Sequence, residues 1–221
     1  MRDLLEFSFV AFSAVFVVVD PLAAVPFFLA MTAREEPARK RATARRAALV
    51  SGLVLAGFAL AGAVVFQLIG VTLAAFKIAG GSLLLLTATD MLRTKLPTTR
   101  ITEGEIAEGT AKEDIAVVPL AMPLLAGPGS MATVVVLMGR ARAEHAYLTV
   151  AVLLSIAVTA VLSYLILAGA SRVDRVLGRT GLNILERVAG LLLAAIAIQF
   201  VIDGIAEALP GMVQRSRWPA P

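Results

Sequence analysis

Six long apolar blocks constrain the fold of this chain more than any other feature of its sequence. They lie at about 7–31, 47–69, 71–93, 115–138, 146–170 and 182–206. A helix of roughly 20 apolar residues matches the ~30 Å hydrocarbon core of a bilayer. Apolar residues make up 59% of the 221 positions and charged residues 16%, which leaves too little polar surface for a soluble domain. The sequence therefore predicts an all-α membrane protein with six transmembrane helices.

The basic residues outside these blocks are divided unequally between the two sides of the predicted membrane. One side carries Arg34, Arg39, Lys40, Arg41, Arg45, Arg46, Arg93, Lys95, Arg100, Lys112, Arg172, Arg175 and Arg179. The other side carries Arg2, Arg140, Arg142, Arg215 and Arg217. Because cytoplasmic loops hold the excess of Lys and Arg, we expect the richer side to be cytoplasmic and both termini to lie outside an inner (plasma) membrane. The same bias explains the net charge of +4 without nucleic-acid binding.

Short matches between spans 1–3 and spans 4–6 indicate an internal repeat. Asp20-Pro21-Leu22 corresponds to Gly127-Pro128-Gly129 at an offset of 107, and residues 76–81 correspond to residues 186–191 at an offset of 110. Because each half has three spans, the second half must be inverted in the membrane, as in many secondary transporters. The predicted parts are a three-helix repeat at 1–93, a cytoplasmic linker at 94–113, an inverted repeat at 114–207 and a C-terminal tail at 208–221.

Prolines interrupt the first and fourth blocks near their centres, where a proline removes a backbone donor and breaks the helix. They are Pro21 and Pro26 in the first block and Pro119, Pro123 and Pro128 in the fourth. We expect helices 1 and 4 to be discontinuous, with second half-helices that begin at Pro21 and Pro128 after the caps Asp20 and Gly127. A half-helix N-terminus at the membrane midplane suits an anion. Two kinks that serve only packing are the alternative.

Several charges and glycines lie within the predicted spans. Asp20 is a candidate for function because an intramembrane carboxylate is costly, and it has three open roles: binding an ammonium group, carrying a proton, or capping the half-helix. Lys77 and Arg187 either extend to the nearest interface or pair, Lys77 with Asp203 and Arg187 with Asp90. The glycines expected to allow close approach of helices are Gly80, Gly81 and Gly190.

Three motifs together resemble the MarC family of membrane proteins. They are Asp20-Pro-Leu-Ala-Ala-Val-Pro26-Phe-Phe, Phe76-Lys-Ile-Ala-Gly-Gly81 with Ala88-Thr-Asp90-Met-Leu, and Pro119-Leu-Ala-Met-Pro-Leu-Leu-Ala-Gly-Pro-Gly129. The resemblance covers nearly the whole chain. It implies a six-span protein from a group that includes transporters of small neutral amino acids such as glycine and alanine. Many relatives carry a glycine and an asparagine where this chain has Ala23 and Ala24, which leaves fewer polar groups in the predicted pocket.

With this resemblance, the leading hypothesis is a secondary transporter, either an exporter or an exchanger, that binds a small neutral amino acid between broken helices 1 and 4. The predicted substrate-binding residues are Asp20, Pro21, Leu22, Ala23, Ala24, Pro26, Ala126, Gly127, Pro128, Gly129 and Ser130. The substrate carboxylate would lie against the half-helix N-termini, and its ammonium group against Asp20 or the carbonyls of Ala126 and Gly127. The bilayer and a coupling ion, proton or sodium, are the other expected partners.

Other functional classes find less support in the sequence. The chain contains no cysteine, no phosphate-binding P-loop and a single histidine, His145, outside the apolar blocks. We therefore expect neither an enzyme nor a bound cofactor. The alternative function is an ion channel or ion exchanger that uses Asp20, with Asp90 and Asp203 along the same path.

Overall fold

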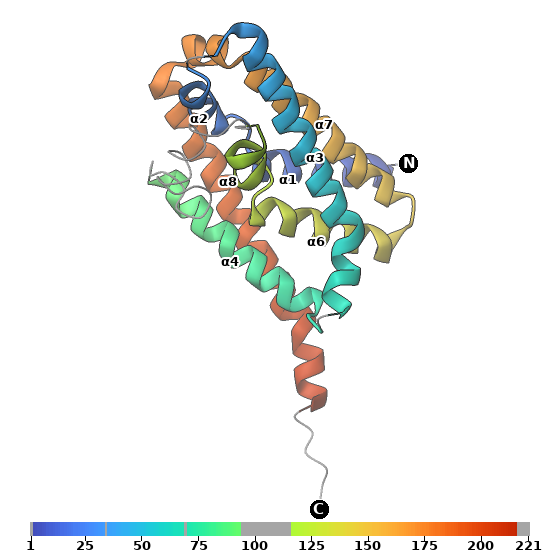
Figure 1. Ribbon diagram of the computed structural model, residues 1–221. Coiled ribbons are helices and arrows are strands. Elements are labelled where there is room, and N and C mark those ends of the chain that lie inside the picture. The colour runs from blue at the N-terminus through green and yellow to red at the C-terminus, as the bar shows by residue number, and fades with distance from the viewer. Residues whose placement is uncertain (1, 34, 69, 94–115, 216–221) are drawn as a thin grey trace, which may run out of the picture.

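The computed structural model describes residues 2–33, 35–68, 70–93 and 116–215, and every regular element among them is a helix (Figure 1). In chain order the helices are α1 (Arg2–Val19), α2 (Ala24–Met31), α3 (Pro37–Leu68), α4 (Leu73–Leu92), η1 (Ala116–Leu125), α6 (Pro128–Glu144), α7 (Leu148–Ala168) and α8 (Ala170–Arg215). The predicted all-α class is confirmed for these residues. The predicted linker at 94–113 lies outside them, as do residues 216–221 of the predicted tail.

Four of these helices contain a stretch that is long and apolar enough to cross a membrane. The stretches are Pro37–Gly62, Leu73–Leu92, Leu148–Ala168 and Thr180–Leu209. Helices α1 and α2 meet this criterion only as a pair, Leu4–Val19 with Ala24–Met31, bent by 45°. The fourth apolar block folds as η1 followed by the 17-residue α6. The described residues therefore give four candidate spans, or five with the bent pair, whereas the sequence predicts six.

Two basic segments that the sequence places in loops are helical instead. Helix α3 begins at Pro37, so the basic residues at 39–46 form its first turns. Arg, Lys and Ala are favourable helix formers and proline is favoured at the first position, which explains why the helix starts before the apolar block. Helix α8 likewise begins at Ala170, and the chain turns within it at Gly178, where φ is 59° and ψ is 177°. Glycine adopts this backbone conformation without a steric penalty.

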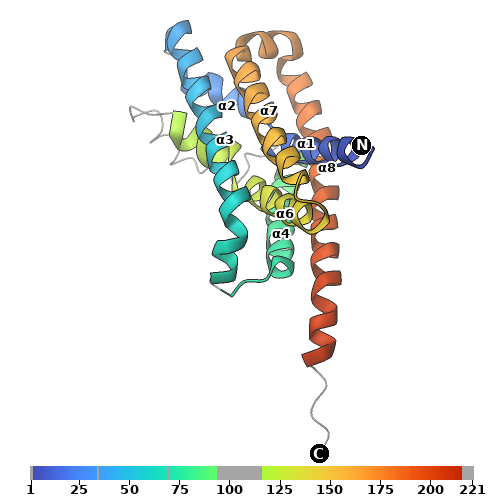
Figure 2. The same cartoon turned by 90° about the vertical axis from the view of Figure 1, so that its right-hand side faces the viewer.

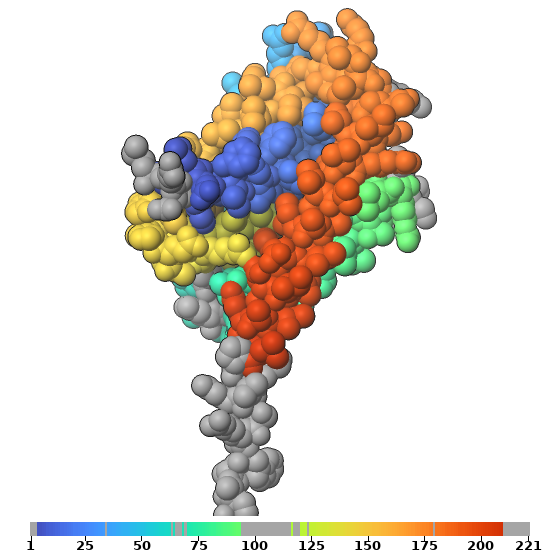
Figure 3. Space-filling model, turned by 180° about the vertical axis from the view of Figure 1, so that it is seen from behind, coloured from blue at the N-terminus to red at the C-terminus, as the bar shows by residue number. Residues whose placement is uncertain are grey.

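The long helices are arranged as two neighbouring pairs with shorter helices across them. Helix α3 packs against α7, and α4 packs against α8. Figures 1 and 2 show α1 and α6 lying crosswise to these pairs, where α1 contacts α7 and α6 contacts α3. Seen from behind, α1 extends between α7 and α6 to reach α8 (Figure 3). At the breaks, Asp20, Pro21, Ala126 and Gly127 are buried, whereas Leu22 and Ala23 are half-buried.

The two ends of the bundle differ in charge. The start of α3 and the turn between α7 and α8 lie at the same end of the molecule (Figures 1 and 2). We call this the basic end, because it contains the basic residues at 39–46 together with Arg172 and Arg175. The C-terminal part of α8 and the turn between α3 and α4 lie toward the opposite end, which we call the far end.

Glycines bring the helix backbones close together in the α4–α8 pair. A Cβ atom on Gly81 would lie 2.6 Å from the carbonyl oxygen of Ala197, and one on Gly190 would lie 2.9 Å from the Cβ of Met91. On the other side of α4, a Cβ on Gly80 would lie 2.6 Å from the Cβ of Ala132 in α6. Small residues allow such close approach of membrane helices, which increases their van der Waals contact.

Candidate functional site

The first break lies between α1 and α2 and is built around Asp20. Its backbone N–H still donates to the carbonyl of Phe16 at 2.9 Å, but its φ of +47° turns the chain out of the helix. Asp is one of the few side chains that tolerate this left-handed region. The carboxylate Oδ1 accepts a hydrogen bond of 3.3 Å from the N–H of Ala23, and the residue is only 5% exposed. Asp20 therefore closes the turn that joins the two helices.

Helix α2 consequently begins at Ala24 rather than at Pro21, where the sequence predicts its start. Its N-cap is Ala23, which has no side chain able to accept a hydrogen bond. Pro21 lies in the preceding turn, and Pro26 lies within the first turn of α2, where a missing N–H costs no helical hydrogen bond. The local reason for the difference is that the Asp20 carboxylate satisfies the N–H of Ala23 instead of an N–H inside the helix.

The second break separates η1 from α6 and follows the sequence more closely. Pro128 is the first residue of α6 and Gly127 is its N-cap, with φ −79° and ψ 170°. The preceding η1 is a π-helix, and the N–H of Ala126 donates to the carbonyl of Ala121 five residues earlier. The buried hydroxyl of Ser130 donates to the carbonyl of Leu125 at 3.0 Å, so it satisfies a backbone acceptor at the end of η1.

Apolar contacts connect the surroundings of the two breaks. A Cβ on Gly129 would lie 3.8 Å from Cγ1 of Val18 in α1 and 2.5 Å from Cδ2 of Leu84 in α4. Ala24, Leu125 and Ala126 belong to one buried hydrophobic cluster. The shared site that the sequence predicts between the N-termini of α2 and α6 stays a prediction.

A cavity of about 390 Å³ opens beside the first break, between the α1–α2 turn and the basic end of α8. Its lining residues are Leu22, Ala23, Pro26, Leu29, Asp174, Leu182, Asn183 and Glu186. Of the predicted site residues, Leu22, Ala23 and Pro26 line this cavity, whereas Asp20, Pro21 and Ala24 are buried next to it. The predicted residues of the second break, 126–130, are not in its lining.

The polar wall of this cavity comes from residues that the sequence prediction missed. Asp174 lies before the Gly178 turn of α8, and Asn183 and Glu186 lie after it, so the turn brings them to one side. Pro26 and Asn183 are exposed, and the cavity is open where they lie. A signal was present: Asp174 interrupts a basic segment, and Glu186 begins the stretch at 186–191 that matches the first repeat.

Two ion pairs connect α8 to its neighbours toward the far end. The side chain of Lys77 in α4 is 2% exposed and its ammonium group pairs with Glu207, while Arg140 in α6 pairs with Asp203. Gln199 donates a hydrogen bond of 2.7 Å from Nε2 to Oδ1 of Asp203. Glu207 thus takes the place predicted for Asp203 as the partner of Lys77. The reason is geometric, since Asp203 and Glu207 are four residues apart on α8 and reach different neighbouring helices.

The remaining predicted residues lie elsewhere in the bundle. Gly190 contacts α4, close to the basic part of α8, and Arg187 is exposed while Asp90 is half-buried. Neither Arg187 nor Asp90 lines the cavity at the first break.

Comparison with known proteins places nearly the whole chain in one group. A family profile described as "MarC family integral membrane protein" matches residues 5–209. A UPF0056 membrane protein of Methanocaldococcus jannaschii is 38% identical over 207 residues, which are 93% of this chain and 98% of that protein. The UPF0056 membrane protein YhcE of Escherichia coli is 34% identical over 202 residues, 91% of this chain and 93% of that protein. No solved structure is significantly similar to the chain.

Proposed function

This chain belongs to the MarC family of integral membrane proteins, and on that basis we propose that it is a secondary transporter of small neutral amino acids such as glycine or alanine. The observation that carries the proposal is the cavity of about 390 Å³ at the break between α1 and α2. Its volume falls toward the low end of small-molecule sites, which suits a small solute. A broken helix beside a solute-sized cavity is a recurring feature of secondary transporters.

The chemistry of the cavity suits a zwitterion. The N-terminus of α2 lies at the Leu22–Ala23 wall and would attract the substrate carboxylate through its partial positive charge. Asp174 and Glu186 lie on the opposing wall and would hold the ammonium group. The small apolar side chain would lie against Pro26 and Leu29. Compared with the sequence prediction, the proposed ammonium site moves from Asp20 or the carbonyls of Ala126 and Gly127 to the α8 carboxylates.

The pattern of helix contacts supports an inverted repeat of three spans in each half. In such a repeat α3 corresponds to α7 and α4 corresponds to α8, and each of these helices packs against its own counterpart. The contact of α1 with α7 corresponds to that of α6 with α3, and the contact of α1 with α8 corresponds to that of α6 with α4. We propose that α1–α2 and η1–α6 are the broken first spans of the two halves, which makes six spans in total.

The ion pairs suggest how access to the cavity alternates. From Glu186 to Asp203, α8 rises by about 26 Å, nearly the thickness of the hydrocarbon core. The cavity therefore lies near the basic end of α8, and the pairs Lys77–Glu207 and Arg140–Asp203 close α4 and α6 onto α8 toward the far end. We propose that breaking these pairs and closing the cavity occur together as the two halves rock. The basic end would be cytoplasmic and both termini outside, with a proton or sodium gradient or exchange as the driving force.

Transport assays in proteoliposomes test this function directly. Vesicles preloaded with unlabelled alanine should take up labelled alanine and glycine, and gradients of proton and sodium imposed separately identify the coupling ion. Glu186→Gln should raise the apparent KM for alanine by about tenfold or more, because a charge-assisted hydrogen bond to the ammonium group is lost. Glu36→Gln, an exposed carboxylate outside the cavity, is the matched control and should behave as wild type.

Two results would count against the proposal. Absence of amino-acid flux in the wild-type vesicles would reject the substrate class, and ion flux without added solute would favour the ion channel or exchanger instead. Equal KM values for Glu186→Gln and wild type would keep the transporter but reject this cavity as the ammonium site.

A further inference from the structure

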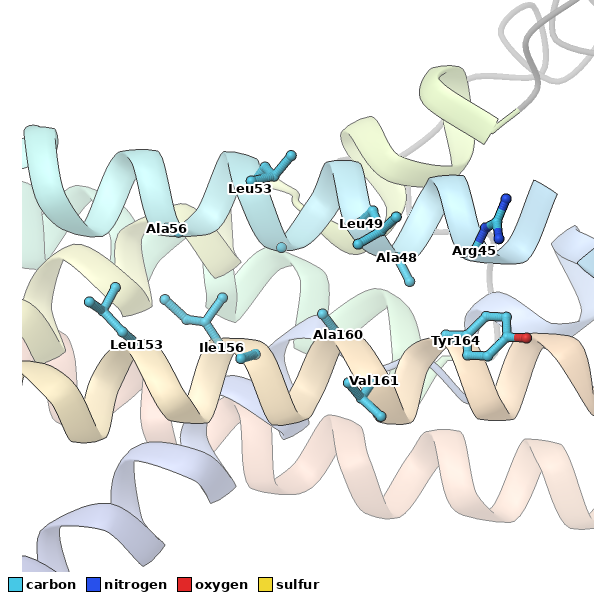
Figure 4. A pocket seen from close by; sticks show the side chains of 12 residues that line it. Arg45, Ala48, Leu49, Leu53, Ala56, Leu153, Ile156, Ala160, Val161 and Tyr164 are labelled. Carbon is cyan, nitrogen blue, oxygen red and sulfur yellow. The ribbon is translucent and has the colours of Figure 1, made fainter. Parts of the chain in front are cut away.

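A long apolar groove runs along the outside of the α3–α7 pair, separate from the cavity at the first break (Figure 4). Its volume is about 550 Å³. The lining residues are Arg45, Ala48, Leu49, Gly52, Leu53, Ala56, Leu153, Ile156, Ala157, Ala160, Val161 and Tyr164. Its walls include exposed apolar side chains such as Leu49, Leu53 and Val161, which are 57%, 72% and 57% exposed. The groove is therefore open to whatever surrounds the helices.

The groove is polar at one end only. Figure 4 shows Arg45 and Tyr164 beside each other at one end, and Ala56 and Leu153 at the other. Arg45 is exposed and supplies the positive charge, and the Tyr164 hydroxyl is a hydrogen-bond donor. Every other lining residue is aliphatic or glycine. The occupant that matches this surface has an apolar chain and an anionic group at one end.

The length of the groove matches one leaflet of a bilayer. From Arg45 to Ala56, α3 rises by about 16 Å, and α7 covers the same length between Tyr164 and Leu153. Half of a ~30 Å hydrocarbon core is about 15 Å. Arg45 directly precedes the apolar block that starts near Ala47, so it lies where a lipid phosphate lies, and tyrosine is enriched at the same depth.

We propose that this groove binds one acyl chain of an anionic phospholipid, with the lipid phosphate at Arg45. An anionic lipid is favoured over a zwitterionic one because one basic residue at a membrane surface changes the affinity for anionic lipid by about fivefold. The site is independent of the transport function, since none of its residues lines the cavity at the first break.

Native mass spectrometry of the full-length protein in detergent tests the site. The protein should be titrated separately with palmitoyl-oleoyl phosphatidylglycerol and with palmitoyl-oleoyl phosphatidylcholine. We expect one molecule of phosphatidylglycerol to be retained, and to be retained more strongly than phosphatidylcholine. Arg45→Gln should weaken retention of phosphatidylglycerol by about fivefold and leave phosphatidylcholine unchanged. Arg41→Gln is the matched control, because Arg41 is one turn away on α3, exposed and outside the groove.

A second pair of variants tests the apolar part of the groove. Ala157 is exposed and lines the groove. Ala157→Phe therefore places an aromatic ring in the groove and should displace the retained lipid. Val158→Phe adds the same ring at the next residue, which is 40% exposed and outside the groove. This variant should retain the lipid as the wild type does. Melting temperatures of all four variants distinguish lipid loss from misfolding.

Three outcomes would overturn the proposal. One is equal retention of the two lipids by the wild type. Another is that Arg45→Gln and Arg41→Gln weaken retention of phosphatidylglycerol equally, which would indicate binding to a diffuse basic surface. The third is a dimer in the same spectra that Ala157→Phe converts to a monomer, because a second copy of the chain would then occupy the groove.

Discussion

Asp20 combines a strained backbone with a specific hydrogen bond. Its φ of +47° is uncommon outside glycine, and its carboxylate holds the N–H of Ala23 at the turn into α2. Both properties are shared by asparagine, which tolerates the left-handed region and has a carbonyl oxygen in the same position. The side-chain charge is thus separable from the turn.

We predict that Asp20→Asn retains the fold and that Asp20→Ala destabilises it. Alanine lacks the acceptor for Ala23 N–H, which costs roughly 1 kcal/mol, and its positive φ adds to that cost. Thermal unfolding in detergent measures the difference between the two variants. The pH profile and the KM of transport measured on Asp20→Asn then separate the roles of Asp20.

The three roles of Asp20 give different results for the asparagine variant. Loss of pH dependence with intact exchange would indicate a proton carrier, and a raised KM would indicate contact with the ammonium group. Kinetics and a pH profile equal to those of wild type would exclude both roles and leave the turn alone.

At the scale of helices, the close contact between α4 and α8 depends on Gly81. The atom that a Cβ would meet there is the backbone carbonyl oxygen of Ala197, at 2.6 Å. A backbone atom cannot move aside as the end of a flexible side chain can, so the two helices must separate to admit a methyl group.

We therefore predict that Gly81→Ala lowers the free energy of unfolding by about 1–3 kcal/mol, the usual cost of overpacking. Gly57→Ala in α3 is the matched control, since nothing lies within 4 Å of the added Cβ. It should be neutral or stabilising by up to about 1 kcal/mol, because alanine restricts the unfolded chain. Equilibrium unfolding in mixed micelles measures both variants. If Gly81→Ala and Gly57→Ala have the same free energy of unfolding, α4 and α8 separate to admit the methyl group without loss of stability.

The sequence predicts elements that depend on local chemistry or on average hydropathy. The all-α membrane class follows from composition, and the start of α6 at Pro128 follows from the preference of proline for a first helical turn. The start of α2 differs because it depends on the unusual φ of Asp20, which no local rule requires. The π-helical hydrogen bonding of η1 is likewise a property of the folded chain rather than of its residue types.

The sequence predicts only part of the lining of the cavity, for a related reason. Leu22, Ala23 and Pro26 are next to a break that proline makes visible in the sequence. Asp174 and Glu186 join them only because Gly178 turns α8, and the direction of that turn cannot be read from residue types. The partner of Lys77 also depends on how α8 is rotated about its axis, and one helical turn separates Asp203 from Glu207.

At the scale of the whole molecule, the two ends of the bundle carry the orientation signal. The basic segments that start α3 and α8 lie together at the basic end, although they are more than a hundred residues apart in the sequence. The positive-inside rule then favours a single orientation, with the basic end in the cytoplasm.

The absence of native cysteine makes this orientation easy to measure, because any introduced cysteine is the only thiol. We predict that Glu144→Cys reacts with a membrane-impermeant maleimide in intact cells, whereas Ser171→Cys reacts only after permeabilisation. Both positions are exposed, and Ser171 lies at the basic end. The reverse labelling pattern would mean that the basic end faces outward.

The straight part of α8 has a mechanical consequence. It carries Glu186 at one end and Glu207 at the other, and its contact with Gly81 at Ala197 lies about midway, roughly 16 Å from the first and 15 Å from the second. A rigid rod pivoting at that contact is a lever with nearly equal arms. A displacement of Glu186 by a bound solute would then move Glu207 by the same distance in the opposite direction. In the proposed transporter, the stiffness of this one helix would link occupancy of the cavity to the ion pairs toward the far end.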